Sequence, residues 1–479
     1  MELILKPGLS TPQRTASARR ILASLSLAIL LSSLGTSIAN VGLPALAQAF
    51  NATFQQVQWV VIAYLLAMAT LIVSVGRLGD LTGRRRLLLA GILLFTLASI
   101  LCAIAPTLYW LIAARALQGL GAAMMMSLAM AFVGEVIPKE KTGSAMGLLG
   151  SMSAVGTALG PSLGGVLIAG PGWQAIFLIN IPLGILVFVL AQRYLPLDRP
   201  AAQRPRFDHL GTLSLAFTLA AYALAMTIGR GHWGLLNVVL LLAAACGIGL
   251  FVLVEKSAVS PLIRLDLLHN TAAGLAMSAL VASVIMATLV VGPFYLSRAF
   301  GLSAAHIGLV LSVGPVAAAL TGMPAGKITD YLGAQASTLI GLSGMVSGTF
   351  LLTLLPVSVG LAGYIAPMVI ITSCYALFQT ANNTAVMDKI ASDQRGMISG
   401  LLNLSRNLGL ITGASLMGAV FALAAGTNAL NTATTEAVAQ GLKITFTLAS
   451  LLIVLALAIA IKDKRSNRAA SAQPRTRAG

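Results

Sequence analysis

The sequence has few charged side chains. Asp, Glu, Lys and Arg make up 9% of its 479 residues, against 58% for hydrophobic residues, which leaves too little polar surface for a soluble globule of this length. Acidic residues are the scarcer kind, at 13 against 30 basic ones. The basic residues stand in short tracts between apolar runs, a pattern that indicates membrane topology and not a nucleic-acid surface. We therefore expect a protein embedded in a lipid bilayer, with no nucleic-acid partner.

Cysteine and histidine are also scarce, with three and four residues. Cys102, Cys246 and Cys374 fall inside apolar runs without paired spacing, so we expect buried, unpaired thiols and neither a disulfide framework nor a zinc site. The metalloprotease pattern His-Glu-x-x-His and the phosphate-binding Walker loop are both missing. We expect no enzyme activity, no metal, no cofactor and no direct use of ATP.

Fourteen apolar runs are long enough to cross a bilayer, which takes about 20 residues. Lys and Arg gather in alternate loops, and only Arg230, Arg298 and Lys443 fall in the loops between. This asymmetry places both termini in the cytoplasm. The fold class is therefore an all-α polytopic membrane protein, with spans near 21–43, 57–75, 87–105, 108–133, 145–169, 175–195, 210–228, 235–254, 272–296, 305–325, 336–355, 361–386, 397–422 and 442–461.

The spans group as six, two and six. We expect an N-terminal six-helix bundle over 21–195, linkers with two extra transmembrane helices over 196–270, and a C-terminal six-helix bundle over 271–461. A cytoplasmic tail over 1–20 precedes them, and a basic cytoplasmic tail over 462–479 follows them and is expected to stay near anionic lipid.

A polar turn between the second and third spans occurs twice in the chain. Its residues are Gly76, Arg77, Asp80, Gly83 and Arg84, and the spacing returns at Gly326, Lys327, Asp330 and Gly333. A repeated turn indicates two related halves. The pattern resembles the signature loop of the major facilitator superfamily, which couples opening of the cytoplasmic side to movement of the halves. The resemblance implies a major facilitator fold of 6+2+6 helices that moves a small-molecule substrate.

The fifth span carries a stripe of small residues with a proline beside them, at Gly156, Gly160, Pro161 and Gly164. Such stripes let membrane helices pack closely. The spacing also resembles the antiporter motif of major facilitator exporters, which implies outward transport. The two interpretations are compatible, because a closely packed, bendable helix can be a moving part.

Arg115 lies within the fourth span, and Gln118 follows three residues later on the same face. A midspan arginine costs about 2.5 to 3.5 kcal/mol on insertion scales, so its expected place is a bundle interior or a wet cavity. The surrounding sequence resembles the fourth-helix motif of the superfamily, whose arginine is linked to proton transfer. The alternative is that Arg115 only braces helices by bonding carbonyl groups.

The stretches from Trp173 to Gly184 and from Leu404 to Gly409 resemble signatures of the fourteen-helix drug:proton antiporter family. The resemblance implies multidrug efflux across a bacterial inner membrane, with antibiotic resistance as the outcome. The chain departs from that family at Gly35, where an aspartate usually stands. Because the acidic residues and histidines all fall in loops, tails or helix ends, proton coupling and its carrier stay open, with Glu135 and Asp388 as poorly placed candidates.

Neutral polar residues recur at helical spacing in several spans, as expected for a face that lines a cavity or packs on another helix. Met126 belongs to a methionine-rich stretch that could form a pliable wall, with soft-metal binding as the weaker alternative. The candidate cavity residues are Thr36, Asn40, Tyr64, Arg115, Gln118, Met126, Tyr375, Gln379, Asn382, Asn403 and Arg406.

The function expected from these features is secondary export of amphiphilic organic compounds, by alternating access of the two halves. The alternative is an exporter or uniporter of a neutral or anionic metabolite that is not proton-coupled through a first-helix carboxylate. A channel and a membrane enzyme are weaker interpretations, since one internally duplicated chain offers no ring of repeated subunits and no catalytic constellation. We expect a monomer whose partners are the substrate, the bilayer and, if coupling exists, protons.

Overall fold

The computed structural model describes residues 12–136, 139–198, 209–227, 234–257, 265–388, 395–426 and 433–472. All regular secondary structure in these residues is helical. The N-half consists of α1 (Pro12–Val41), α2 (Leu43–Ala49), α3 (Phe54–Thr82), α4 (Arg84–Ala103), α5 (Leu108–Val136), α6 (Lys139–Ala169), α7 (Ala175–Leu178) and α8 (Asn180–Tyr194).

The extra pair consists of α9 (His209–Thr227) and α10 (Leu235–Ser257). The C-half consists of α11 (Leu265–Phe300), α12 (Ala304–Leu332), α13 (Ala334–Leu354), the 3-10 helix η1 (Val357–Val359), α14 (Ala362–Met387), α15 (Arg395–Thr412), the π-helix η2 (Gly413–Met417), α16 (Gly418–Ala424) and α17 (Thr435–Ala472).

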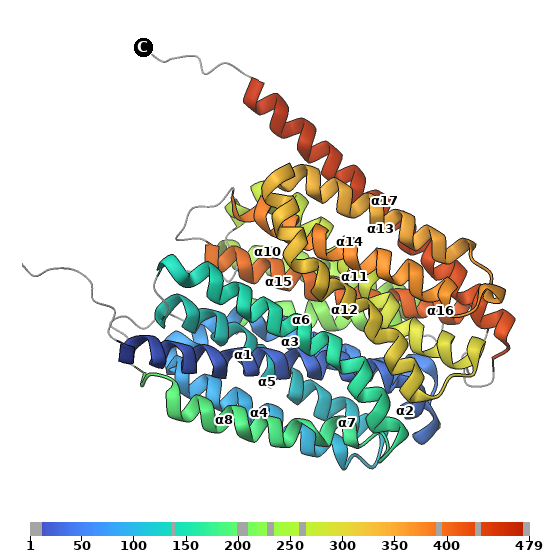
Figure 1. Ribbon diagram of the computed structural model, residues 1–479, viewed down its shortest axis with the longest axis horizontal. Helices are drawn as coiled ribbons and strands as arrows, with labels where there is room; N and C mark the ends of the chain where they lie inside the picture. Colours follow the sequence, from blue (N-terminus) through green and yellow to red (C-terminus); the bar gives the residue numbers. More distant parts are fainter. Residues whose placement is uncertain are drawn as a thin grey trace, which may run out of the picture.

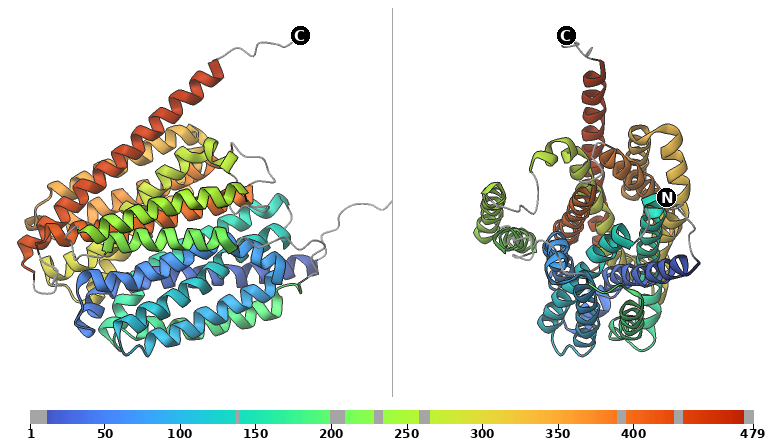
Figure 2. Two further views of the ribbon diagram at one scale, coloured as in Figure 1. Left: turned by 180° about the vertical axis from the view of Figure 1, so that it is seen from behind. Right: turned by 90° about the vertical axis from the view of Figure 1, so that its left-hand side faces the viewer.

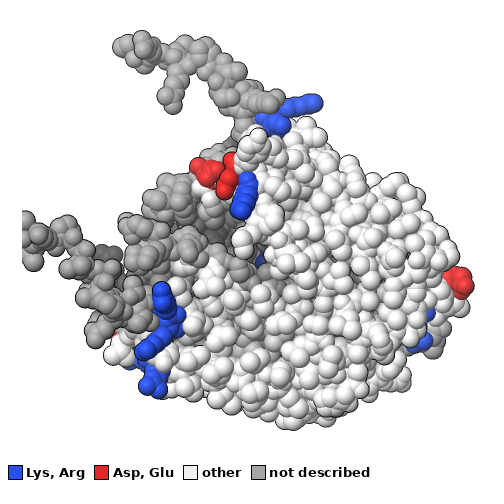
Figure 3. Space-filling view, viewed as in Figure 1, with Lys and Arg blue, Asp and Glu red and all other residues white. Residues whose placement is uncertain are grey.

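The predicted spans correspond to long apolar helices. Thirteen of them are long and apolar enough to cross a membrane, and the remaining predicted span is α9, whose apolar part Leu210–Ala225 is shorter. Figure 3 shows a wide uncharged band across the molecule, with Lys and Arg at its edges.

The expectation of buried thiols holds only for Cys102, because Cys246 is exposed on the extra pair and Cys374 is half-buried. An exposed thiol is compatible with apolar surroundings, since cysteine behaves as a small hydrophobic residue.

The axes of the long helices are roughly parallel, the chain direction alternates between successive helices, and both ends of the described chain lie at the same end of the stack (Figure 1). We call this the basic end; it is the predicted cytoplasmic end. The last turns of α17 extend beyond the other helices there (Figures 1 and 2). The extra pair lies on the outside of the bundle (Figure 2).

The small-residue stripe of α6 packs against α1. A Cβ added at Gly156 would overlap the Leu30 carbonyl, and one added at Gly160 would overlap the Ser37 hydroxyl. Two hydrogen bonds reinforce this contact, because Ser37 donates to the Gly156 carbonyl at 3.2 Å and the Ser33 and Ser153 hydroxyls lie 2.8 Å apart. Gly164 lies one turn farther on, against Val41 and Ile38. The stripe therefore brings two backbones into close contact, as small residues do in membranes.

Helix α9 makes hydrogen bonds to both halves of the protein. The hydroxyls of Thr212 on α9 and Ser74 on α3 lie 2.7 Å apart. Farther along the same helix, the hydroxyl of Tyr222 donates to Thr412 on α15 at 3.1 Å. The extra pair is thus attached across the boundary between the N-half and the C-half, and the sequence pattern alone did not indicate this position.

We expect Tyr222→Phe to lower stability by about 0.6 kcal/mol, the average for a side-chain hydrogen bond between membrane helices. The phenyl ring keeps the packing and removes only the hydroxyl that reaches Thr412. Thermal unfolding of the purified protein measures the effect. Phe217→Leu is the matched control, because Phe217 is 58% exposed on the same helix. An equal fall in both variants would contradict a specific bridge.

Candidate functional site

Arg115 on α5 is fully buried inside the N-half. Its Nε donates to the Val60 carbonyl at 2.9 Å, and its Nη1 donates to the Gly35 carbonyl at 3.1 Å. Nη1 also donates to Oε1 of Gln118, one turn along the same helix. The guanidinium carbon lies 4.2 Å from the centre of the Tyr64 ring, within range of a cation–π interaction. Arg115 therefore binds three helices together, and its predicted contact with Gln118 is present.

Gln118 and Tyr64 extend this network to neighbouring helices. The Gln118 amide donates to the Ser99 hydroxyl on α4 at 2.7 Å, and Ser99 donates to the Phe95 carbonyl at 2.8 Å. The Tyr64 hydroxyl donates to the Ser32 carbonyl on α1 at 2.9 Å. Each link joins two different helices or caps a backbone carbonyl, so the network holds the orientation of the arginine.

All the partners of Arg115 are neutral. Carbonyl groups, an amide and aromatic rings surround it, and its Nη2 is buried without a hydrogen-bond partner in the described part of the chain. A buried charge is ordinarily paired with an opposite one. The site therefore carries an uncompensated positive charge within the described residues.

Gly35 stands at the position where the family resemblance predicts a carboxylate. A Cβ added there would lie 2.9 Å from the edge of the Phe95 ring and 3.4 Å from the Tyr64 hydroxyl. The Gly35 carbonyl itself accepts the bond from Arg115. The backbone of α1 thus supplies a neutral acceptor to Arg115 at this position, and the Phe95 ring fills the adjacent space.

The candidate cavity residues separate into two groups by accessibility. Half-buried side chains, each with part of its surface accessible, are Thr36, Met126, Tyr375, Gln379, Asn403 and Arg406. Buried side chains are Asn40, Tyr64, Arg115, Gln118 and Asn382.

Asn40 and Asn382 lie between helices in this structure and do not face open space. The Asn40 amide donates to the Thr36 carbonyl of its own helix at 3.2 Å. The Asn382 amide on α14 donates to the Gly274 carbonyl on α11 at 3.0 Å. An amide in apolar surroundings is stabilised by such a carbonyl, and helical spacing does not say which face of a helix meets a neighbour.

Arg406 on α15 is the second arginine within the spans. It is half-buried, and its Nε is buried without a hydrogen-bond partner among the described residues. One residue earlier, the Ser405 hydroxyl donates to the Leu275 carbonyl on α11. The C-half therefore also presents a positive group for which the described residues supply no ion-pair partner.

The first hinge is anchored by a residue that the sequence pattern did not single out. Asp198, after α8, accepts the backbone N–H groups of Arg85 at 2.7 Å and Arg86 at 3.1 Å. A carboxylate at a helix N-terminus satisfies free N–H groups and the helix dipole. Gly83 has φ +98°, and a Cβ there would overlap the Asp198 carboxylate. Gly76, Arg77 and Asp80 belong to the described backbone of α3, but their burial and side-chain contacts are outside what the structure describes. Arg84 is the first residue of α4.

The second hinge has the same backbone turn with open surroundings. Gly333 has φ +83°, and a Cβ added there would meet no atom of the described chain within 4 Å. Asp330 is exposed. The two hinges, alike in sequence, therefore differ in their attachment, because the carboxylate that holds the first comes from the linker that follows the N-half.

The halves meet closely at the end opposite the basic end, which is the predicted outer end. Gly165 on α6 faces Gly308 on α12, and a Cβ added at Gly165 would lie 2.5 Å from the Ala304 carbonyl and 2.9 Å from the Gly308 Cα. A Cβ at Gly308 would overlap the Pro161 carbonyl. Glycine is required on both sides of this contact because the two backbones leave no room for a side chain.

Two further contacts join the halves near the same end. The Gln58 amide on α3 donates to the Ala414 carbonyl at 2.9 Å, within the π-helix η2. A π-helix alters the ladder of backbone hydrogen bonds and is often found at functional sites. The Phe54 ring packs edge-on against Phe294 at 4.7 Å and against Phe421 at 5.7 Å. Sequence reasoning missed these contacts, since no local pattern marks a π-helix or its partner.

The stretch from Gly160 to Gly164 also spells Gly-x-Ser-x-Gly, a pattern of serine hydrolases. In that class the serine stands on a sharp turn between a strand and a helix. Here Ser162 lies within the continuous helix α6, and its hydroxyl donates to the Leu159 carbonyl at 3.2 Å. The stretch thus lacks the geometry of a nucleophile.

Comparisons with known proteins agree with this architecture. "Uncharacterized transporter YebQ" of Escherichia coli (strain K12) is 32% identical over 420 residues, covering 87% of this chain and 91% of the relative. "Multidrug resistance protein Stp" of Mycobacterium tuberculosis is 33% identical over 80% of this chain and 72% of its own. "Riboflavin transporter RibZ" of Clostridioides difficile is 30% identical over 84% and 88%.

A solved structure of a bacterial homologue of the human lysosomal transporter Spinster, in an inward-facing and unoccupied conformation, has the same fold. Its TM-score is 0.68 at 16% sequence identity, and the match covers 95% of this chain and 98% of that one. The family model described as Major Facilitator Superfamily matches residues 25–414. The chain therefore belongs to the major facilitator superfamily of transporters.

Proposed function

We propose that this transporter exports amphiphilic organic compounds, and that its translocation path accepts neutral or anionic compounds better than cationic ones. The observation that carries the proposal is the environment of Arg115, which is fully buried among neutral groups. A fixed positive charge that no carboxylate balances repels a cation and attracts an anion.

The second arginine supports the same selectivity. Arg406 is half-buried on α15, and its Nε has no hydrogen-bond partner in the part of the chain that the structure describes. The half-buried residues Tyr375 and Gln379 supply neutral hydrogen-bonding groups on α14. An amphiphile with an anionic or neutral polar end matches this combination, because ligand sites join apolar walls to a few well-placed polar groups.

Transport proceeds by alternating access of the two halves. The contacts between Gly165 and Gly308, and between Phe54 and its two aromatic partners, close the predicted outer end. Release of a compound on that side requires these contacts to separate. The hinge at Gly83, anchored by Asp198, lies at the basic end and would control the opposite movement.

The relatives support two substrate classes. A relative named for multidrug resistance favours foreign amphiphiles. A relative named as a riboflavin transporter favours a metabolite instead. The two arginines, with neutral groups around Arg115, would also suit a neutral or anionic metabolite. Charge selectivity is common to both, and it can be measured before the natural substrate is known.

Binding of two dyes with the same xanthene core separates the possibilities. Sulforhodamine B is an anion, and tetramethylrhodamine methyl ester is a cation. We expect the purified protein to bind the anion about tenfold more tightly, a difference of about 1.4 kcal/mol, measured by fluorescence polarisation. Riboflavin serves as the neutral competitor. Tighter binding of the cation would refute the proposed selectivity.

The Arg406→Gln variant tests which charge matters. It keeps a polar, though shorter, side chain and removes the positive charge from a half-buried position. We expect the preference for the anionic dye to shrink. Arg193→Gln is the matched control, because Arg193 is exposed near the end of α8 and its loss should leave the preference unchanged.

A further inference from the structure

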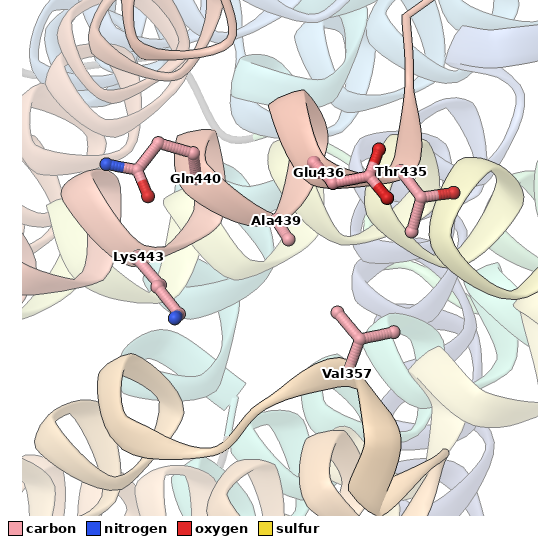
Figure 4. A pocket seen from close by; sticks show the side chains of 6 residues that line it. All are labelled: Val357, Thr435, Glu436, Ala439, Gln440 and Lys443. Carbon is pink, nitrogen blue, oxygen red and sulfur yellow. The ribbon is translucent and has the colours of Figure 1, made fainter.

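A pocket of about 310 Å³ lies at the predicted outer end, away from the arginines of the translocation path. It is formed between the start of α17 and the η1 segment that links α13 to α14. Its lining residues are Val357, Thr435, Glu436, Ala439, Gln440 and Lys443. Figure 4 shows Lys443 and Val357 facing the gap from its two sides.

The pocket carries one negative and one positive group. Glu436 and Lys443 are both exposed and stand seven positions apart on α17, which places them on one face of the helix, about 10.5 Å apart along its axis. Neither side chain has a hydrogen-bond or ion-pair partner within the part of the chain that the structure describes. Two free opposite charges at the rim of one pocket match a ligand that carries both charges.

The pocket lies at the level of lipid headgroups. Residues 444–461 of α17 are uncharged, and Lys443 and Lys462 stand at their two ends. Eighteen residues of helix extend about 27 Å, close to the hydrocarbon thickness of a bilayer. Lys443 therefore lies at the outer boundary of the hydrocarbon, and Glu436 lies in the headgroup layer beyond it.

We propose that this pocket binds the headgroup of a zwitterionic phospholipid that carries a primary ammonium group, such as phosphatidylethanolamine. The lipid phosphate would bind Lys443 and the amide of Gln440, and the ammonium would donate to the Glu436 carboxylate. Val357 and Ala439 supply apolar contacts for the glycerol region. Lys443 is one of few basic residues on the predicted outer side, where the positive-inside rule disfavours them.

Other lipids fit the pair of charges less well. An anionic headgroup without an ammonium would leave Glu436 beside a negative charge. A trimethylated ammonium has no N–H group to donate to the carboxylate. The proposal does not depend on the transported substrate, because the pocket lies outside the network around Arg115.

Lipid binding to the purified, full-length protein tests the site. Native mass spectrometry would compare phosphatidylethanolamine, phosphatidylcholine and phosphatidylglycerol with identical acyl chains. We expect phosphatidylethanolamine to bind most tightly, and Glu436→Gln or Lys443→Gln to weaken its binding by about 1.4- to 5-fold, the range for exposed charge pairs. Lys462→Gln, at the other end of the same apolar stretch, should leave the binding unchanged.

Several outcomes would overturn the proposal. Equal binding of phosphatidylcholine would show that the ammonium is not recognised. Equal binding of phosphatidylglycerol, or no change in Glu436→Gln, would reduce the pocket to a general anion contact at Lys443. Equally strong competition by glycerophosphoethanolamine, which has no acyl chains, would identify a soluble ligand and not a membrane lipid.

Discussion

Gly308→Ala is expected to slow transport strongly without preventing insertion into the membrane. The added methyl group would overlap the Pro161 carbonyl of the N-half and lie 2.9 Å from the Gly165 Cα. Overpacking of this kind costs about 1 to 3 kcal/mol, which corresponds to about a 5- to 150-fold loss of the state closed at the outer end. The transport rate per inserted molecule in proteoliposomes measures the effect.

Gly322→Ala provides the matched control on the same helix. A Cβ added at Gly322 meets no described atom within 4 Å, so the substitution should leave the rate unchanged. Equal loss in both variants would indicate a general requirement for glycine in α12. Normal transport by Gly308→Ala would show that the close contact of α6 with α12 is not part of the cycle.

Gly35→Asp, combined with Phe95→Leu, is expected to make transport depend on a pH gradient. The new carboxylate would stand next to Arg115, because the Gly35 carbonyl already accepts a bond from Nη1 at 3.1 Å. Phe95→Leu relieves the contact of the added Cβ with the phenyl ring, which would otherwise be 2.9 Å. One coupled proton supplies about 1.4 kcal/mol per pH unit, so accumulation should rise about tenfold across one unit.

Gly35→Asn with Phe95→Leu controls for shape, because the amide has nearly the size of the carboxylate and cannot release a proton. We expect this variant to remain insensitive to the gradient. The same response from the Asp and Asn variants would mean that the space at position 35 matters and the charge does not. The comparison thus isolates the ionisable group.

The membrane architecture could be predicted from the sequence because hydropathy and the placement of basic residues are local properties. The runs near 57–75 and 108–133 correspond to α3 and α5. The contact of Arg115 with Gln118 follows from spacing on one helix. In each case the relevant partner lies within a few residues along the chain.

Contacts between helices could not be predicted in this way. The Val60 and Gly35 carbonyls that hold Arg115 come from other helices, and backbone groups leave no mark in a sequence. Asp198 looked like an ordinary linker residue, although it caps α4 from a distance of more than a hundred positions. Asn382 has the spacing of a cavity residue and instead bonds a neighbouring helix. Periodicity identifies a polar face but not what that face meets.

The role of the missing carboxylate bears on how transport is driven. With Gly35 at the usual acidic position, the substrate gradient or the membrane potential acting on a charged substrate can supply the energy. Asp388 is exposed at the end of α14, and the Glu135 side chain lies outside the described residues. Among the described residues, the groups that contact Arg115 are all neutral, and Asp388 is not one of them.

Export of sulforhodamine B by the wild-type protein in proteoliposomes, with and without a pH difference of one unit at a fixed membrane potential, tests this account most directly. The charge of the dye does not change with pH in this range, so the gradient acts only on the protein. We predict that the export rates with and without the pH difference differ by less than about twofold. A transporter that couples one proton would instead gain about tenfold in accumulation of the dye from one pH unit. Export that requires the pH gradient would contradict this account, and Glu135→Gln and Asp388→Asn would then show whether either residue carries the proton.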